Sequence, residues 1–221
     1  MTPVMPFDTA LFDVDGTLID SNHAHAQTWT QALREHGIAT DVATIRSLVG
    51  MGGDKLLPRV AHLEEDSPEG RAIAARKKAL FSEWLPSLRP TRGARDLVQF
   101  LRSHDVTLVI ATSAGDDEMN ALLKQAGVDD VFPLRTSKDD ASESKPDPDI
   151  VHAAMHRSRA RPKTTVMIGD TPYDAEAATR AGVRTIALRC GGYWSDEDLR
   201  GASAIFDDPA ALLEHLRGAG R

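Results

Sequence analysis

Asp13-Val14-Asp15-Gly16-Thr17-Leu18 directly follows the apolar run Phe7 to Phe12, and this stretch decides how the rest of the chain is interpreted. The apolar run predicts a strand, and the glycine allows the backbone to turn sharply after it. Few structural requirements would explain two acids, one residue apart, at such a turn. In an open α/β sheet the reactive groups lie beyond the carboxyl ends of the strands. A carboxylate pair there can bind a divalent cation, attack an electrophile and move a proton.

From Thr91 onward, apolar strand patterns alternate regularly with helical stripes. The expected strands cover 106–111, 164–168 and 185–188, and the expected helices carry the apolar stripes of 94–101, 119–126, 150–155, 175–181 and 212–216. Pro148 is expected to open the third of these helices, and Asp208-Pro209 to cap and open the last. Such alternation is typical of a parallel sheet with helices on both faces.

Residues 21–88 interrupt this alternation with a helical stretch that contains no convincing strand. The simplest organisation is a discontinuous α/β core with a Rossmann-like parallel sheet, built from residues 1–19 and 90–221. An α-helical cap, residues 20–89, is then inserted after the first strand.

The composition limits the class of protein. The 221 residues carry a net charge of −7, which argues against non-specific nucleic-acid binding because that needs a basic surface. A single cysteine, Cys190, excludes an intrachain disulfide and fits a reducing compartment. No run approaches the ~20 apolar residues of a membrane span, and Met1 to Phe7 lacks the pattern of a signal peptide. We therefore expect a cytoplasmic protein without nucleic-acid or membrane partners, and either a monomer or a dimer.

Reactive side chains follow three of the expected strands. Asp13 ends the first strand, Thr112-Ser113 follows the second, and Gly169-Asp170 follows the third, with Asp174 four residues further on. Lys145 precedes the helix expected from Pro148 and can reach the same edge. Several carboxylates at one point repel each other unless a divalent ion joins them. Hydroxyls, loop N–H groups and a lysine can then hold phosphoryl oxygens, so the pattern predicts a cation-dependent phosphoryl site.

These residues also resemble the four ordered motifs of the haloacid dehalogenase-like (HAD) hydrolase superfamily. The matching segments are Asp13-Val14-Asp15-Gly16-Thr17, Thr112, Lys145-Pro146 and Gly169-Asp170-Thr171-Pro172-Tyr173-Asp174. Together they span nearly the whole chain, and the long gap after the first motif is similar to members with a helical cap. Within the superfamily, the chain is similar to the phosphoglycolate phosphatase and β-phosphoglucomutase branch.

The resemblance implies roles for the acids. Asp13 would be the nucleophile that forms an aspartyl-phosphate. Asp15 would protonate the leaving oxygen and then activate water. Mg²⁺ would be bound by Asp13, the carbonyl of Asp15, and Asp170. Asp174 would support the metal site without contacting the metal directly. The ordinary alternatives are turn caps at Asp13 and Asp15, a plain turn residue at Asp170 and a helix cap at Asp174. Capping and metal support can coexist at Asp174.

The resemblance also implies that Thr112 and Lys145 bind the phosphoryl group, with Ser113 close by. Lys145 would in addition offset the charge between Asp13 and the phosphate. The ordinary alternatives are a strand-end hydroxyl for Thr112 and a solvated surface lysine for Lys145.

The expected cap carries weaker signals. His25 resembles, by position, a hinge histidine that meets the general acid in the mutase branch, although a satisfied or exposed histidine is equally expected. Gly50-Met51-Gly52-Gly53-Asp54-Lys55 lacks the ending of a nucleotide P-loop. It is either a turn between helices or a specificity loop that brings Lys55 to an anionic substrate. The basic run Arg71 to Lys78 is expected to be a solvated helix face.

The leading functional hypothesis is a Mg²⁺-dependent phosphatase, a phosphoric monoester hydrolase that acts on a small phosphorylated metabolite through an aspartyl-phosphate. The alternative is a sugar phosphomutase of the β-phosphoglucomutase type, which would use the same residues. That branch usually has an acidic pair where this chain has Gly169-Asp170, which favours the phosphatase. A non-catalytic phosphate-binding protein is less favoured, because no catalytic group is missing. A dehalogenase is disfavoured because such enzymes do not need the acid at Asp15. A phosphonatase is disfavoured because that class depends on a different first motif and on a lysine in the cap.

Overall fold

The computed structural model describes residues 5–219 and contains a parallel sheet, in the spatial order β3-β2-β1-β4-β5-β6. All five strand pairings are parallel. The strands are β1 (Thr9–Phe12), β2 (Thr107–Ala111), β3 (Leu134–Thr136), β4 (Thr165–Gly169), β5 (Arg184–Leu188) and β6 (Ala204–Phe206). The strand order reverses direction beside β1, and in such a sheet this is where a ligand-binding crevice opens.

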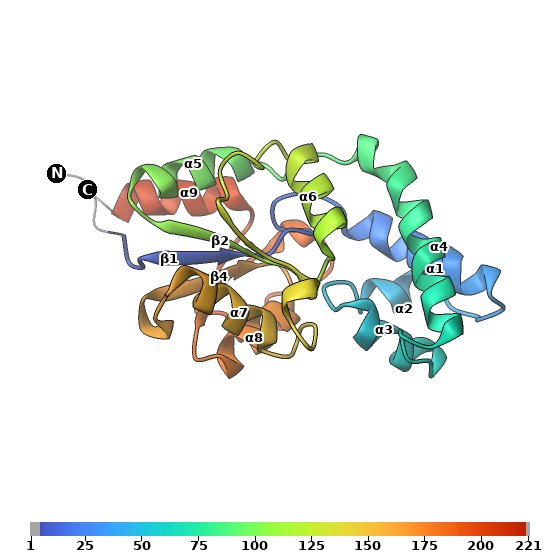
Figure 1. Cartoon of the computed structure of the whole chain (residues 1–221). Helices are drawn as coiled ribbons and strands as arrows, with labels where there is room; N and C mark the ends of the chain where they lie inside the picture. Colours follow the sequence, from blue (N-terminus) through green and yellow to red (C-terminus); the bar gives the residue numbers. More distant parts are fainter. Residues whose placement is uncertain (1–4, 220–221) are drawn as a thin grey trace.

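Alternate side chains of β1 enter different hydrophobic clusters on the two faces of the sheet, as the two-residue period of a strand requires. Phe12 joins the cluster under α5, α6 and α9, and Leu11 joins the cluster under α7 and α8. Figure 1 shows α5 and α9 on one face of the sheet, with α7 and α8 on the other. These helices are α5 (Ala94–Ser103), α6 (Asp116–Gln125), α7 (Asp149–Ser158), α8 (Pro172–Arg180) and α9 (Pro209–Ala219). The order of layers agrees with the predicted Rossmann-like class.

Four helices lie between β1 and α5 and form a separate body beyond the strand ends (Figure 1). They are α1 (Asn22–Glu35), α2 (Val42–Arg46), α3 (Gly53–Ala61) and α4 (Pro68–Trp84). Trp29, Leu33, Ile45, Leu57 and Ile73 belong to a third hydrophobic cluster made only by this segment. The helices therefore bury their apolar faces against one another, while the boundaries at 19/20 and 89/90 stay a prediction.

The chain crosses between the two bodies twice, and the crossings lie side by side. The N–H of Asp20 donates to the carbonyl of Arg89 over 2.9 Å, and the N–H of Thr91 donates to the carbonyl of Leu18 over 3.1 Å. The crossings are joined by backbone hydrogen bonds, so the chain connects the helical body to the core at one place, a few residues after Asp15.

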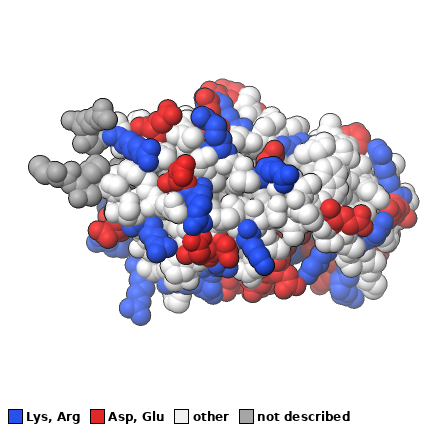
Figure 2. Space-filling model, turned by 90° about the horizontal axis from the view of Figure 1, so that it is seen from above, with Lys and Arg blue, Asp and Glu red and all other residues white. Residues whose placement is uncertain are grey.

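The remaining short helices are single turns of 3₁₀ type. They are η1 (Leu85–Ser87), η2 (Lys138–Asp140), η3 (Pro162–Thr164) and η4 (Arg189–Gly191). Within residues 5–219, no helix has both the length and the apolar character needed to cross a bilayer. Figure 2 shows acidic and basic side chains interspersed over one face of the molecule.

Some predicted elements differ in detail from the structure. The first strand begins at Thr9 rather than Phe7, although Phe7 is buried. Pro148 is the N-cap of α7 rather than its first residue. The short strands β3 and β6 were not predicted as strands, because three residues without a clear alternation carry too little pattern.

Candidate active site

The turn after β1 depends on the glycine at its centre. Gly16 has φ +72°, a left-handed conformation that side chains rarely adopt. A Cβ there would also lie 2.3 Å from an oxygen of Asp170 and 2.1 Å from the amide nitrogen of Asn22. A glycine is therefore required for the acids of this turn to approach the acid that follows β4.

Lys145 joins two buried acids. Its Nζ lies 2.7 Å from Oδ1 of Asp13 and 2.7 Å from Oδ1 of Asp174, and the lysine is fully buried. Burial lowers the pKa of Lys145, but the two carboxylates outweigh burial and the net shift is upward. Lys145 is therefore a charged ammonium group and is not a surface lysine.

Burial raises the pKa of Asp13 well above its ordinary value, and the neighbouring carboxylates of Asp174 and Asp170 add to the rise. The ammonium of Lys145 opposes the rise without cancelling it. An additional positive charge at this position would therefore favour the carboxylate form of Asp13.

Asp170 accepts hydrogen bonds from Thr17, the last residue of the first motif, and from Asn22, which follows it. Nδ2 of Asn22 donates to Oδ2 over 2.7 Å, and the hydroxyl of Thr17 donates to Oδ1 over 3.3 Å. Burial raises the pKa of Asp170 to about 8, and repulsion from Asp174 contributes to the rise. Two hydrogen bonds thus orient this carboxylate but leave it short of positive charge.

The donor set fits a metal ion. Carboxylate oxygens of Asp13, Asp170 and Asp174 lie within 4.8 Å of one another, and all three residues are buried. Oxygen donors suit hard divalent cations, and the upward pKa shifts of Asp13 and Asp170 indicate a cluster that lacks positive charge. A buried acidic group that can bind a metal ion is therefore present at the strand ends.

Asp174 also has a structural partner. Together with Thr171 it forms a capping box at the start of α8, in which Oδ2 accepts from the Thr171 N–H over 3.1 Å. Its other oxygen contacts Lys145. The side chain of Asp174 therefore both caps α8 and belongs to the acidic group. The sequence had left these two roles open.

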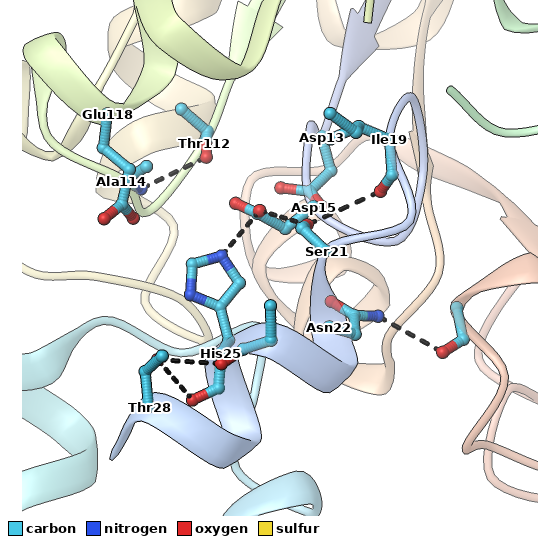
Figure 3. Close-up of polar contacts among 12 residues, drawn as sticks. Asp13, Asp15, Ile19, Ser21, Asn22, His25, Thr28, Thr112, Ala114 and Glu118 are labelled. Carbon is cyan, nitrogen blue, oxygen red and sulfur yellow. Dashed lines mark hydrogen bonds and ion pairs between the residues drawn. The ribbon is translucent and has the colours of Figure 1, made fainter. Parts of the chain in front are cut away.

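Asp15 contacts the helical body. Its Oδ1 lies 2.7 Å from Nε2 of His25 and also accepts from the hydroxyl of Ser21 (Figure 3). The His25 ring stacks on Phe81, with 4.1 Å between the ring centroids. Burial raises the pKa of Asp15, but the attraction of His25 and the hydrogen bonds from His25 and Ser21 outweigh it, and the net shift is downward.

Two hydroxyl side chains, Thr112 and Ser113, follow β2 and lie opposite Asp13 and Asp15. Oγ1 of Thr112 accepts from the N–H of Ala114 over 3.1 Å, so its own proton is free to be donated. Oγ of Ser113 is buried without a hydrogen-bond partner. Figure 3 places Thr112 across the gap from Asp13 and Asp15. Both hydroxyls line the same cavity as the two acids, which suits them to bind an oxygen-rich group there.

A cavity of about 560 Å³ lies between the strand ends and the helical body. Asp13, Asp15 and His25 line its inner end. The rest of the lining comes from α1, α3, α4, the first turn of α6, η2, and the loops before α3, before α4 and after β2. The cavity therefore has room for more than a phosphate group.

The structure does not bring Lys55 to this cavity, so the interpretation of Lys55 as a substrate contact is not supported. Its Nζ lies 2.8 Å from an oxygen of Asp147 and also pairs with Glu143. The glycines of the same loop, Gly50, Gly52 and Gly53, do line the cavity. Lys55 extends from the start of α3 toward the core, because it forms ion pairs with two carboxylates there.

The basic run Arg71 to Lys78 is not a uniformly solvated face, which corrects the prediction. Lys77 is 7% exposed, lines the cavity and lies 2.9 Å from Glu118. Its ammonium sits 4.6 Å from the centre of the Phe81 ring. Charge alone could not separate Lys77 from its solvated neighbours, since only packing of α4 against the core decides which lysine turns inward.

The contacts of Ser21 with Asp15 and of Asn22 with Asp170 were not predicted from the sequence. Ser21 is the N-cap of α1 by position, but its side chain makes no capping hydrogen bond. The absence of a capping box after Asp20-Ser21-Asn22 was the one available signal in the sequence.

The comparisons with known proteins agree with this geometry. The sequence profile described as haloacid dehalogenase-like hydrolase matches residues 10–188, which is most of the chain. The chain therefore belongs to the haloacid dehalogenase-like hydrolase family.

Among curated relatives, the chain is 28% identical to validoxylamine A 7'-phosphate phosphatase of Streptomyces hygroscopicus subsp. limoneus, over 82% of this chain and 85% of that protein. It is 30% identical to a phosphoglycolate phosphatase of Pseudomonas putida, over 92% of this chain and 77% of that protein. A solved hydrolase from Pseudomonas syringae superposes with a TM-score of 0.89 at 28% identity, over 96% of this chain and 99% of that one.

Proposed function

We propose that the protein is a Mg²⁺-dependent phosphatase that hydrolyses a small phosphate monoester through a phosphoryl group carried on Asp13. The observation that carries the proposal is the arrangement of Asp13 between Lys145 and the acidic group, at the inner end of a cavity that Asp15 also enters. The two curated relatives described above are both named as phosphatases.

In the first proposed step, an oxygen of Asp13 attacks phosphorus and the bond between phosphorus and the ester oxygen breaks. Asp15 transfers its proton to that leaving oxygen. Water then attacks phosphorus, Asp15 takes a proton from the water, and the bond from Asp13 to phosphorus breaks. Inorganic phosphate and the free alcohol are the products, and Asp13 and Asp15 regain their starting states.

The surrounding residues support these steps. The ammonium of Lys145 reduces the repulsion between the Asp13 carboxylate and the phosphate dianion. The free hydroxyls of Thr112 and Ser113 donate to phosphoryl oxygens. Mg²⁺ held by Asp13 and Asp170, with Asp174 in reach, would supply further positive charge to the phosphoryl group.

The helical body, residues 20–89, is proposed to act as a cap. It contributes His25 to the general acid and closes the outer side of the cavity, so bulk water is restricted. The paired chain crossings after Asp15 would be the hinge.

The mutase alternative is disfavoured by Gly169. A Cβ at this position would lie 2.4 Å from Cγ of Asp174, so the acidic pair usual in the mutase branch does not fit without moving Asp174. Asp174 is itself held by Lys145 and by the α8 capping box.

Phosphate release from an aryl phosphate tests the proposal directly. Activity should need added Mg²⁺, disappear with excess chelator and return when Mg²⁺ is restored. Full activity in excess chelator would reject the metal requirement. Incubation with glucose 1-phosphate separates the alternatives, since a mutase would form glucose 6-phosphate with little phosphate release.

A further inference from the structure

The outer part of the cavity is rich in charge that the proposed chemistry does not use. Apart from Asp13 and Asp15, the lining includes five carboxylates and three lysines, which are Glu65, Asp116, Asp117, Glu118, Asp139, Lys77, Lys78 and Lys138. His25, the histidine of the lining, already faces Asp15. The balance of these side chains is therefore negative.

Each of the three lysines has an acid partner. Lys77 lies 2.9 Å from Glu118, and Lys78 lies 3.0 Å from Asp117. Lys138 pairs with Glu65. No lysine in the lining thus offers an uncompensated positive charge.

The two remaining acids add to the negative balance. Asp116 accepts a hydrogen bond from the hydroxyl of Ser137 over 2.6 Å, and Asp139 accepts from the N–H of Asp116 over 2.8 Å. These contacts hold the carboxylates in place without neutralising them. A second anion on the substrate would therefore meet repulsion at the outer end, and this repulsion is greatest beside the half-buried carboxylates of Glu65 and Glu118, because Asp116 and Asp139 are exposed to solvent.

We infer that the leaving group of the substrate is uncharged and rich in hydroxyls, as in a carbohydrate or cyclitol monophosphate, and carries neither a carboxylate nor a second phosphate. Hydroxyls can donate to the free oxygens of the acids and accept from the lysines. Trp29, Met51, Leu56 and Ala74 supply apolar walls for C–H faces. The inference rests on the proposed phosphatase function and specifies its class of substrate.

Glu118 is the residue on which this selectivity should depend most. Its partner Lys77 is 7% exposed and sits above the rings of Phe81 and Trp29, at 4.6 and 5.9 Å from their centres. Lys77 has little freedom to leave the cavity. If the charge of Glu118 is removed, a fixed ammonium remains beside the leaving group and attracts an anionic one.

Two esters of similar size test this. Phosphoglycolate and hydroxyethyl phosphate differ in one group, a carboxylate in place of a CH₂OH. Wild-type enzyme should show a kcat/KM for hydroxyethyl phosphate at least about tenfold above that for phosphoglycolate. Glu118→Gln should raise kcat/KM for phosphoglycolate about tenfold and change that for hydroxyethyl phosphate far less. The control Glu214→Gln makes the same change on the exposed face of α9 and should leave the ratio unaltered.

Lys77→Gln provides a second, opposite variant if Glu118→Gln folds poorly. It leaves the carboxylate of Glu118 unbalanced, so the ratio should move further against phosphoglycolate. A wild-type preference for phosphoglycolate would overturn the inference and leave the phosphatase function intact. An unchanged ratio in both variants would also overturn it. Failure to hydrolyse these esters and an aryl phosphate would overturn the phosphatase function and the inference together.

Discussion

Asp13 and Asp15 leave the same turn but meet different partners. Asp13 contacts the ammonium of Lys145, and burial among acids raises its pKa. Asp15 contacts His25 and Ser21, and these contacts lower its pKa despite burial. One turn thus places two chemically equal carboxylates in different electrostatic surroundings. The lowered pKa of Asp15 favours the carboxylate that the proposed water-activating step needs, and added positive charge beside Asp13 would favour its attacking form.

Substitution of each acid should produce a different defect. Asp13→Asn removes the proposed nucleophile, so no phosphoenzyme should form with any ester. Asp15→Asn removes acid–base assistance, typically worth ~10²–10⁴-fold. An aryl phosphate needs less protonation of its leaving group, so Asp15→Asn should lose less of its phosphorylation rate with that substrate. Rapid-quench kinetics on aryl and alkyl phosphates measures both steps. Parallel losses for the two variants on both esters would contradict the assigned roles.

His25 should influence the pH dependence of catalysis. Its contact lowers the pKa of Asp15, so His25→Gln should raise that pKa. The first step needs protonated Asp15 and weakens as pH rises through this pKa, while the second step needs the carboxylate and weakens as pH falls through it. Both limbs of the pH–rate profile should therefore move to higher pH.

The matched control is His23→Gln, because His23 is exposed two residues earlier in the same helix. Its pH–rate profile should superpose on that of the wild type. If the profile of His25→Gln superposed on it as well, His25 would have no electrostatic role toward Asp15.

The start of α8 combines a helix cap with the acidic group. Oγ1 of Thr171 accepts from the N–H of Asp174 over 3.2 Å, and its hydroxyl donates to Oδ2 of the same residue over 2.7 Å. The cap therefore orients a carboxylate that also meets Lys145. Loss of this cap should affect both stability and activity.

Thr171→Ala should lower the free energy of unfolding by about 1 kcal/mol, the usual value of a lost N-cap. It should also lower kcat, because Asp174 is no longer held in one orientation. Ser67→Ala removes the equivalent cap of α4, where Ser67 Oγ accepts from Gly70 N–H over 3.0 Å, in the helical body, which contributes no residue to the acidic group. Denaturant unfolding should give similar losses for both variants, and only Thr171→Ala should reduce turnover. Equal activities would show that the cap is purely structural.

The stability of the folded protein should depend on pH through its acidic group. The pKa of Asp170 is raised to about 8 in the folded protein, against about 3.9 in an unfolded chain. Between these values the folded state holds a proton that the unfolded state has released. Without a divalent cation, this group therefore makes stability fall as pH rises from about 4 to about 8.

A divalent cation should reverse that trend, since it competes with the proton for the same carboxylate. The increase in Tm caused by saturating Mg²⁺ should grow from pH 5 to pH 8. In Asp170→Asn, the loss of stability with rising pH in the absence of a cation should be smaller. The growth of the Mg²⁺-induced increase in Tm from pH 5 to pH 8 should also be smaller. Thermal unfolding over this pH range measures the effect, and a Mg²⁺ shift independent of pH would argue against binding at Asp170.

Much of the architecture followed from local patterns along the chain. Alternating strands and amphipathic helices indicated the parallel sheet, and apolar stripes located α5, α6, α7, α8 and α9. The acids and hydroxyls at strand ends indicated the phosphoryl site, because parallel strands necessarily bring their carboxyl ends to one edge. A short edge strand such as β3 escaped this reasoning, since pairing with β2 rather than its own pattern makes it a strand.

What the sequence by itself determined is the fold class and the family, because these depend on periodicity and on motifs that are local in the chain. It also predicted which acids and hydroxyls gather at the strand ends. Only the tertiary structure decided how each side chain is paired. Packing of the helical body against the core turned Lys55 toward Glu143 and Asp147, and buried Lys77 against Glu118 inside the cavity. Such pairings join residues tens of positions apart, and the charge of a lysine says nothing about which distant acid the folded chain will bring to it.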